Sequence, residues 1–197
     1  EQTSPWYDAP EPQHIHANAA RRALLDKHEL VIYRSHSNWD ALAGDGVRDQ
    51  AIAALGIADL RTVAERKFFS VLELPAPVTV NELQRVVENG VAYAGCRIFG
   101  DADKQIRRFS FLIGGFGENQ FHMPQVARDL GAEAIIIGEM SEFIVISCLE
   151  MGLPVIETLH SISEIPAIKR QAALLAERLP DLRVEYIPSG ATAFESS

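Results

Sequence analysis

Residues 131–164, GAEAIIIGEMSEFIVISCLEMGLPVIETLHSISE, decide the fold of this chain. The segment 131–139 is an apolar run bounded by glycine, which is typical of a buried strand. The run 141–152 favours a helix that ends at its final glycine, and 153–160 has the composition of a second strand. Two strands joined by one helix indicate an α/β fold with a parallel or mixed sheet.

The alternation of helices and strands extends along the rest of the chain. Helical spacing of apolar residues predicts further helices at 17–30, 47–57, 122–130 and 163–180. Another helix is expected from a cap at Thr79 or Asn81 to near Gly90. Runs of β-branched and aromatic residues predict further strands at 30–35, within 66–80, and at 93–101, 106–119 and 181–190.

A proline-bounded linker near residues 72–80 is the expected domain boundary. The chain has 197 residues, which is enough for one large domain or two small ones. We therefore expect two α/β domains with mixed sheets, residues 1–72 and residues 73–197.

Composition restricts the classes of function. The net charge of −9 repels nucleic-acid backbones and anionic membranes, so a nucleic-acid partner is not expected. Cys96 and Cys148 are far apart and outside any Cys-x-x-Cys pattern, which fits a reduced, cytoplasmic compartment. The sequence has no apolar run of about 18 residues, so no membrane span is expected.

Polar side chains follow three of the predicted strands. His36 and Asp40 follow the strand at 30–35, Glu139 follows the strand at 131–139, and His160 and Glu164 follow the strand at 153–160. In open α/β sheets, ligands bind beyond the carboxyl ends of the strands. Imidazole and carboxylate groups are ligands for Zn, Mn or Fe, and a carboxylate can bridge two ions that activate a hydrolytic water.

Each of these residues also has a structural interpretation. Glu164 matches the acid of a Ser161-x-x-Glu164 capping box, but that cap would put Pro166 well inside the helix, where its missing N–H matters. A cap at Ser163 places Pro166 in the first turn and leaves Glu164 available as a ligand. His36 could be a loop residue, Asp40 a turn former and Glu139 a surface acid.

The glycine-rich stretch GGFGEN, residues 114–119, could bind phosphate or form a turn. It matches neither G-x-G-x-x-G nor G-x-x-x-x-G-K-[ST], so a turn is the better interpretation.

Three stretches, taken in order, resemble one known family. Residues 31–57 resemble a family segment in which a strand leads into His-Thr-Asn-x-Asp and then a helix that ends in Leu-Gly. Residues 131–143 resemble its strand ending in Gly-Glu, and residues 158–164 resemble its last motif, Gly-His-x-x-x-Glu, with Leu159 in place of the glycine. The chain is similar to the Nif-three-like, dinuclear-metal-centre hexameric proteins, also called GTP cyclohydrolase type 2 homologues.

The resemblance implies a dinuclear metal site. Asp40, His160 and Glu164 match metal ligands, and His36 matches a histidine that lines the same site. The opening Glu1-Gln2-Thr3 resembles the end of the family's His-Glu-x-Thr motif, which makes Glu1 a further ligand. The histidine of that motif, with a strand–helix–strand section, is then expected upstream of residue 1.

The resemblance also implies a fold, an assembly and an activity. Family members have two α/β domains and form toroidal hexamers. We expect a metal-dependent hydrolase that holds two divalent ions (Zn, Mn or Fe) and acts on a small substrate, such as a nucleotide or phosphoester. His36 or Glu139, at neighbouring strand ends, is the expected proton shuttle. The alternatives are a non-catalytic metal-binding regulatory or interaction protein that forms a hexameric ring, and a plain α/β fragment without a site.

Overall fold

The computed structural model describes residues 15–116 and 120–188 of the chain. Contacts between residues divide the chain into two units, Glu1–Asn38 and Trp39–Ser197. In the first unit, helix α1 (His16–His28) ends at Glu29, which adopts a left-handed conformation. The short helix α2 (Ser37–Asp40) leads into the second unit.

Two of the predicted strands are not formed. Residues 31–36 have no regular secondary structure, and Val31 and Tyr33 in this segment are 94% and 85% exposed. A strand is also predicted at 181–190. The structure describes this segment as far as residue 188, and residues 183–188 are irregular. A strand needs a neighbour that takes up its backbone hydrogen bonds, and none of the described strands pairs with either segment. Within the described residues, neither segment therefore forms the predicted strand.

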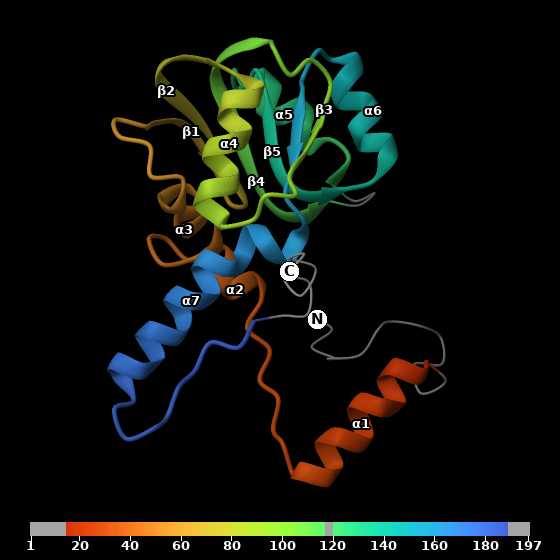
Figure 1. Ribbon diagram of the computed structural model, residues 1–197, viewed down its shortest axis with the longest axis vertical. Coiled ribbons are helices and arrows are strands. Elements are labelled where there is room, and N and C mark those ends of the chain that lie inside the picture. Colours follow the sequence, from red (N-terminus) through yellow and green to blue (C-terminus); the bar gives the residue numbers. More distant parts are fainter. Residues whose placement is uncertain (1–14, 117–119, 189–197) are drawn as a thin grey trace. The chain divides into compact units, whose positions relative to one another are not determined.

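The second unit is an α/β structure with one mixed sheet of six strands, which confirms the predicted fold class (Figure 1). Its elements, in chain order, are α3 (Val47–Ala54), β1 (Arg61–Arg66), β2 (Phe69–Thr79), α4 (Val80–Val91), β3 (Arg97–Phe99), β4 (Gln105–Phe116), α5 (Met123–Asp129), β5 (Ile135–Met140), α6 (Glu142–Glu150), β6 (Val155–Glu157) and α7 (His160–Arg178). Among the described residues, none of the helices is long and apolar enough to span a bilayer.

The strand order in the sheet is β1-β2-β4-β5-β6-β3. The three central strands β4, β5 and β6 are parallel to one another, whereas β1, β2 and β3 pair in antiparallel fashion. The carboxyl ends of three neighbouring strands therefore meet at one edge of the sheet, where α/β proteins bind ligands.

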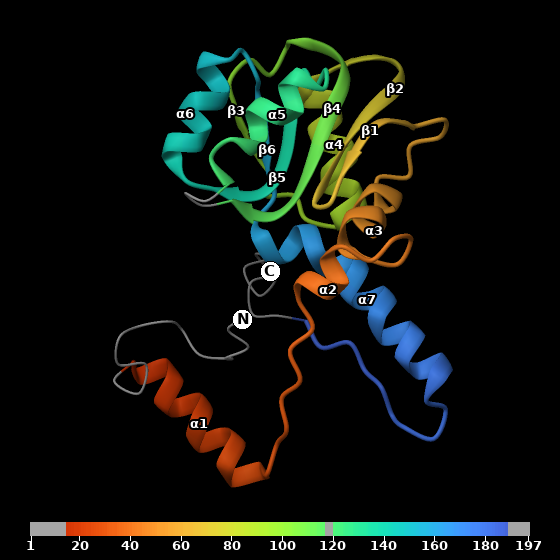
Figure 2. The same ribbon diagram turned by 180° about the vertical axis from the view of Figure 1, so that it is seen from behind.

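Helices cover both faces of the sheet, and a hydrophobic core lies on each face. Successive isoleucines of β5 alternate between the cores: Ile136 packs with the α4 side, and Ile135 and Ile137 pack with the α5 and α6 side. Figure 1 shows α4 in front of the sheet, and Figure 2 shows α5 on the opposite face. Residues 135–138 of β5 are buried, and the sequence there is a continuous apolar run, as expected for a parallel strand that is covered on both faces.

Strand β2 runs without interruption through the segment expected to be a linker. Its pairing with β4 shifts between Glu73 and Val78, around the exposed Pro75 and Pro77. The prolines lack backbone donors, so they fall where the ladder is interrupted. The boundary expected between residues 72 and 73 lies inside this strand, and the division into domains 1–72 and 73–197 stays a prediction.

The N-cap of helix α4 is Thr79, one of the two caps expected from the sequence, and the structure shows a capping box there. The Thr79 side chain accepts from the backbone N–H of Glu82, and the Glu82 carboxylate accepts from the backbone N–H of Thr79 at 2.7 Å. We expect Thr79→Ala to lower the free energy of unfolding by about 1 kcal/mol. Ser141→Ala is the matched control, because Ser141 precedes α6 without a side-chain cap. Urea unfolding of both variants measures the difference, and equal losses would contradict the role of the Thr79 cap.

Candidate metal centre

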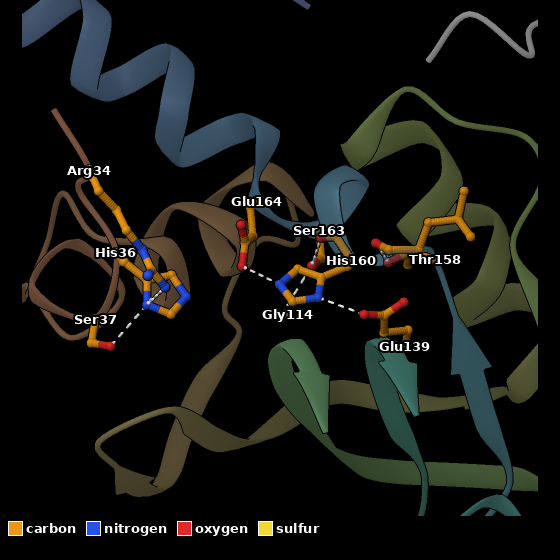
Figure 3. Close-up of polar contacts among 10 residues, drawn as sticks. Arg34, His36, Ser37, Gly114, Glu139, Thr158, His160, Ser163 and Glu164 are labelled. Carbon is orange, nitrogen blue, oxygen red and sulfur yellow. Dashed lines mark hydrogen bonds and ion pairs between the residues drawn. The ribbon is translucent and has the colours of Figure 1, made fainter. Parts of the chain in front are cut away.

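The candidate site lies at the carboxyl ends of β4 and β5 and at the first turn of α7. Gly114 and Gly115 are near the end of β4, Glu139 is near the end of β5, and His160 is the first residue of α7, which follows β6. Figure 3 shows the His160 ring between the carboxylates of Glu139 and Glu164. The sequence-based expectation that these three residues come together at the strand ends therefore matches their positions.

Each ring nitrogen of His160 faces one carboxylate. Nδ1 lies 2.8 Å from Oε1 of Glu139, and Nε2 lies 3.2 Å from Oε1 of Glu164. Helical geometry explains the second contact, because residues four apart lie on the same face of a helix. The side chains of Glu139 and His160 are 57% and 43% exposed, whereas that of Glu164 is 24% exposed. The cluster is thus open to a ligand from solvent on the Glu139 side.

Helix α7 begins at His160, so the predicted cap at Ser163 is wrong. Leu159 is the residue before the helix, and Pro166 lies inside it. Because proline has no N–H, the carbonyl of Ile162 has no partner four residues later. Local sequence preference favoured a later start, but the fully buried Ser163 hydroxyl donates instead to the His160 carbonyl at 2.7 Å.

Three glycines form the floor beneath His160. A Cβ at Gly115 would lie 2.7 Å from both Oε1 of Glu139 and Nδ1 of His160. A Cβ at Gly114 would lie 2.9 Å from Oε1 of Glu164, and a Cβ at Gly138 would lie 2.9 Å from the Cα of His160. Side chains at these positions would occupy the place of the cluster, so the glycines are part of the site.

The glycine floor changes the interpretation of the GGFGEN stretch. Gly114 and Gly115 belong to β4, so the turn predicted to begin at Gly114 does not begin there. Gly114 has a φ of +64°, which glycine adopts without strain. The glycines were visible in the sequence, but their contact with the imidazole depends on the parallel pairing of β4 with β5.

The two carboxylates stabilise the protonated imidazole. The hydrogen bond to Glu164 is the largest cause, and together with the Glu139 carboxylate it outweighs burial and raises the pKa of His160 from 6.5 to about 9. In the metal-free protein His160 is therefore an imidazolium at neutral pH. A cation that takes Nε2 must displace this proton, so metal binding is expected to strengthen as the pH rises.

The raised pKa of His160 predicts how stability changes with pH. Because the folded-state pKa is higher than that of the unfolded chain, the stabilisation is fully present below pH 6.5 and is lost as the pH rises through about 9. We expect the difference in urea midpoint between the metal-free protein and His160→Gln to shrink between about pH 6 and about pH 10. A difference that is constant over this range would contradict the ion pairing of His160.

Asp40, another predicted ligand, is the last residue of α2. A hydrogen bond of the preceding residue holds it to α7. The neighbouring Trp39 donates its indole N–H to the carbonyl of Ala167 at 3.2 Å. Ala167 lies one helical turn beyond Glu164, so the peptide that carries Asp40 is attached to the same helix as the cluster.

The remaining predicted site residues lie in the first unit. Nδ1 of His36 accepts from Arg34 at 3.1 Å, because a guanidinium can only donate, and it also contacts Ser37 (Figure 3). The backbone N–H of His36 donates to the side chain of Asn38, as in an Asx-type turn. Glu1 lies outside the described residues.

His160 and Glu164 are spaced like two neighbouring ligands of one metal ion, but these two residues alone are not a complete metal site. Zinc binds imidazole nitrogen and carboxylate oxygen at about 2.0–2.2 Å, which puts neighbouring tetrahedral ligands about 3.4 Å apart. The 3.2 Å between Nε2 of His160 and Oε1 of Glu164 matches such a pair. Within residues 15–116 and 120–188, however, no three His, Cys, Asp or Glu side chains are grouped so that all could hold one ion.

Fold and site together define an α/β protein with a carboxylate–imidazole–carboxylate cluster at the ends of parallel strands. The chain belongs to the Duf34/NIF3 (NGG1p interacting factor 3) family, whose model matches residues 8–192. This result agrees with the resemblance found in the three sequence motifs.

Curated relatives and solved structures agree with this assignment. The chain is 31% identical over 171 residues to the "GTP cyclohydrolase 1 type 2 homolog" of Clostridium perfringens. The aligned region covers 84% of this chain and 63% of that relative. The solved structure of protein ybgI, described as of unknown function, has 25% identity and a TM-score of 0.74, covering 92% of this chain and 71% of that one. A Bacillus cereus protein related to NIF3 shares the fold, with a TM-score of 0.72 at 13% identity over 88% of this chain and 76% of that one.

Proposed function

We propose that the His160 cluster binds divalent metal and that the protein is a metal-dependent hydrolase of a small substrate. The observation that carries the proposal is the placement of the His160 ring between Glu139 and Glu164 at the strand ends. An imidazole whose second nitrogen is bonded to a carboxylate is the usual arrangement of a metal-binding histidine. The names of the curated relatives, which refer to a GTP cyclohydrolase, support a nucleotide or phosphoester substrate.

Four residues are proposed as metal ligands, together with two ions drawn from Zn, Mn and Fe. Nε2 of His160 and the carboxylate of Glu164 form the pair that the fold brings together. Asp40 and Glu1 would complete the set of residues that hold the ions. When bound, such ions supply Lewis acidity and activate water for hydrolysis.

The other residues of the cluster orient the imidazole and move protons. Glu139 accepts from Nδ1 and thereby fixes the tautomer that leaves Nε2 for the metal. Its carboxylate is also the most exposed of the cluster, so it is a candidate to take a proton from the attacking water. His36 is the second candidate for proton transfer.

The alternative is a metal-binding protein that interacts with a partner and has no catalytic activity. The family description, NGG1p interacting factor 3, names an interaction and supports this alternative. Under both functions we propose that copies of the chain assemble into a hexamer in the cytoplasm, as the family resemblance implies.

A turnover assay distinguishes the two functions. Purified protein, loaded separately with Zn, Mn or Fe, is tested on a panel of nucleotides and phosphoesters next to chelated protein. Hydrolysis that depends on metal and is lost in Glu164→Ala would support the hydrolase. No turnover on any member of the panel, combined with dissociation of the oligomer after chelation, would support the interaction protein.

A further inference from the structure

Ser163 carries a buried hydroxyl that joins α7 to β4 beside the candidate site. Its residue is 0% exposed. The hydroxyl donates to the carbonyl of His160 at 2.7 Å and accepts from the backbone N–H of Gly114 at 3.3 Å. The same oxygen lies 2.8 Å from the place where a Cβ of Gly138 would be. One side chain of α7 is therefore hydrogen-bonded to β4 and leaves no room for a side chain at Gly138 of β5.

The backbone before His160 shows how tightly this first turn is held. Leu159 has a φ of 96° and a ψ of 144°, a combination that is rare for any residue except glycine. Its N–H donates to Gly138 at 2.7 Å, and its carbonyl accepts from the N–H of Ser163 at 3.2 Å. A strained conformation persists only where the surroundings fix it on several sides. The turn from Leu159 to Ser163 is thus fixed from both ends.

We infer that Ser163 is a positioning residue: its hydroxyl holds the backbone of His160 against the ends of β4 and β5, so that the ring stays between Glu139 and Glu164. Ser163 contacts neither ring nitrogen, and it acts only through the His160 carbonyl and the glycine floor. The inference rests on the proposed metal site for its effect on binding, but the effect on ring position is independent of metal.

Thr158 provides the matched control. It is also 0% exposed, and its hydroxyl donates to the carbonyls of Ile137 and Leu159 at 3.3 and 3.1 Å, whereas no hydrogen bond joins it to His160. Thr158→Val removes a hydroxyl of equal burial at nearly constant shape. Both variants are expected to lower stability, because each leaves buried backbone groups with fewer partners.

The test compares Ser163→Ala with Thr158→Val in two measurements. In the metal-free protein, the ring nitrogens of His160 are followed by ¹⁵N NMR: we expect wild-type signals for Thr158→Val and shifted or broadened signals for Ser163→Ala. In a Zn²⁺ titration we expect Ser163→Ala to bind at least about tenfold more weakly than the wild type, and Thr158→Val to bind within about twofold of it.

Unchanged ring signals in Ser163→Ala would overturn the inference, even if the wild type binds no metal. Shifted signals in Ser163→Ala, combined with a wild type that binds no metal, would keep the positioning role and reject the metal site instead. If Ser163→Ala does not fold, Ser163→Cys takes its place, because a thiol is only a weak donor. Only the ring signals are compared for this variant, because a thiol is itself a zinc ligand. Ring signals of Ser163→Cys that equal those of Thr158→Val would then contradict the inference.

Discussion

Glu164→Ala is expected to reduce the affinity for divalent metal by at least about 100-fold, because it removes a proposed ligand and not only an orienting partner. Glu164 pairs with Nε2 of His160 and is largely shielded from solvent. Removal of its carboxylate leaves that nitrogen without the second donor that an ion needs at this position. The change is measured by metal titration of chelated protein.

A control on the same helix separates ligation from general charge effects. Glu177 lies near the exposed end of α7, so Glu177→Ala removes an equal charge away from the cluster. We expect wild-type affinity for Glu177→Ala and the large loss only for Glu164→Ala, with both proteins folded by circular dichroism. The same loss is expected for Asp40→Ala. Stoichiometric metal retained in Glu164→Ala or Asp40→Ala would defeat the proposed ligand set.

Gly138→Ala is expected to lower the free energy of unfolding by at least about 3 kcal/mol. The new Cβ would overlap the carbonyl oxygen of Gly114 and would lie 2.9 Å from the Cα of His160. Both are parts of the backbone that cannot rotate away, so either β4 or α7 must move. Thermal or urea unfolding measures the loss.

Two other glycines make this prediction specific. Gly56 has a φ of +62° but open space around it, so Gly56→Ala should cost only about 1–2 kcal/mol, from its backbone conformation. Gly115→Ala meets the side chains of Glu139 and His160, which can rotate, so it should disturb the cluster more than the fold. A loss for Gly138→Ala no larger than that for Gly56→Ala would contradict the close packing of the site floor.

Local signals in the sequence were sufficient for much of the fold. The cap of α4, expected at Thr79 or Asn81, and the strand formed by the isoleucines of β5 are determined by a few neighbouring residues. The cap is found at Thr79, and the strand is present as predicted. The strand predicted at 30–35 is not formed. A strand is stable only when it pairs with another strand, and the local sequence does not reveal whether such a partner is present.

The sequence was sufficient to predict which residues come together at the candidate site, but not how the backbone beneath them is arranged. The order of Glu139, His160 and Glu164 along the chain, together with the rule for strand ends, was enough to bring them together. The start of α7 at His160 depends instead on tertiary contacts of Ser163 with β4, which no pattern within the helix encodes. The glycine floor was missed because it depends on the pairing of two strands distant in the sequence.

The most direct test of the account is the metal content of the purified, unchelated protein, measured by plasma mass spectrometry and normalised per chain. The account predicts close to two transition-metal ions per chain in the wild type and a clear loss in Glu164→Ala. The absence of bound metal in the wild type, even after reconstitution with Zn, Mn and Fe, would contradict it and would leave His160 as an imidazolium held between two carboxylates.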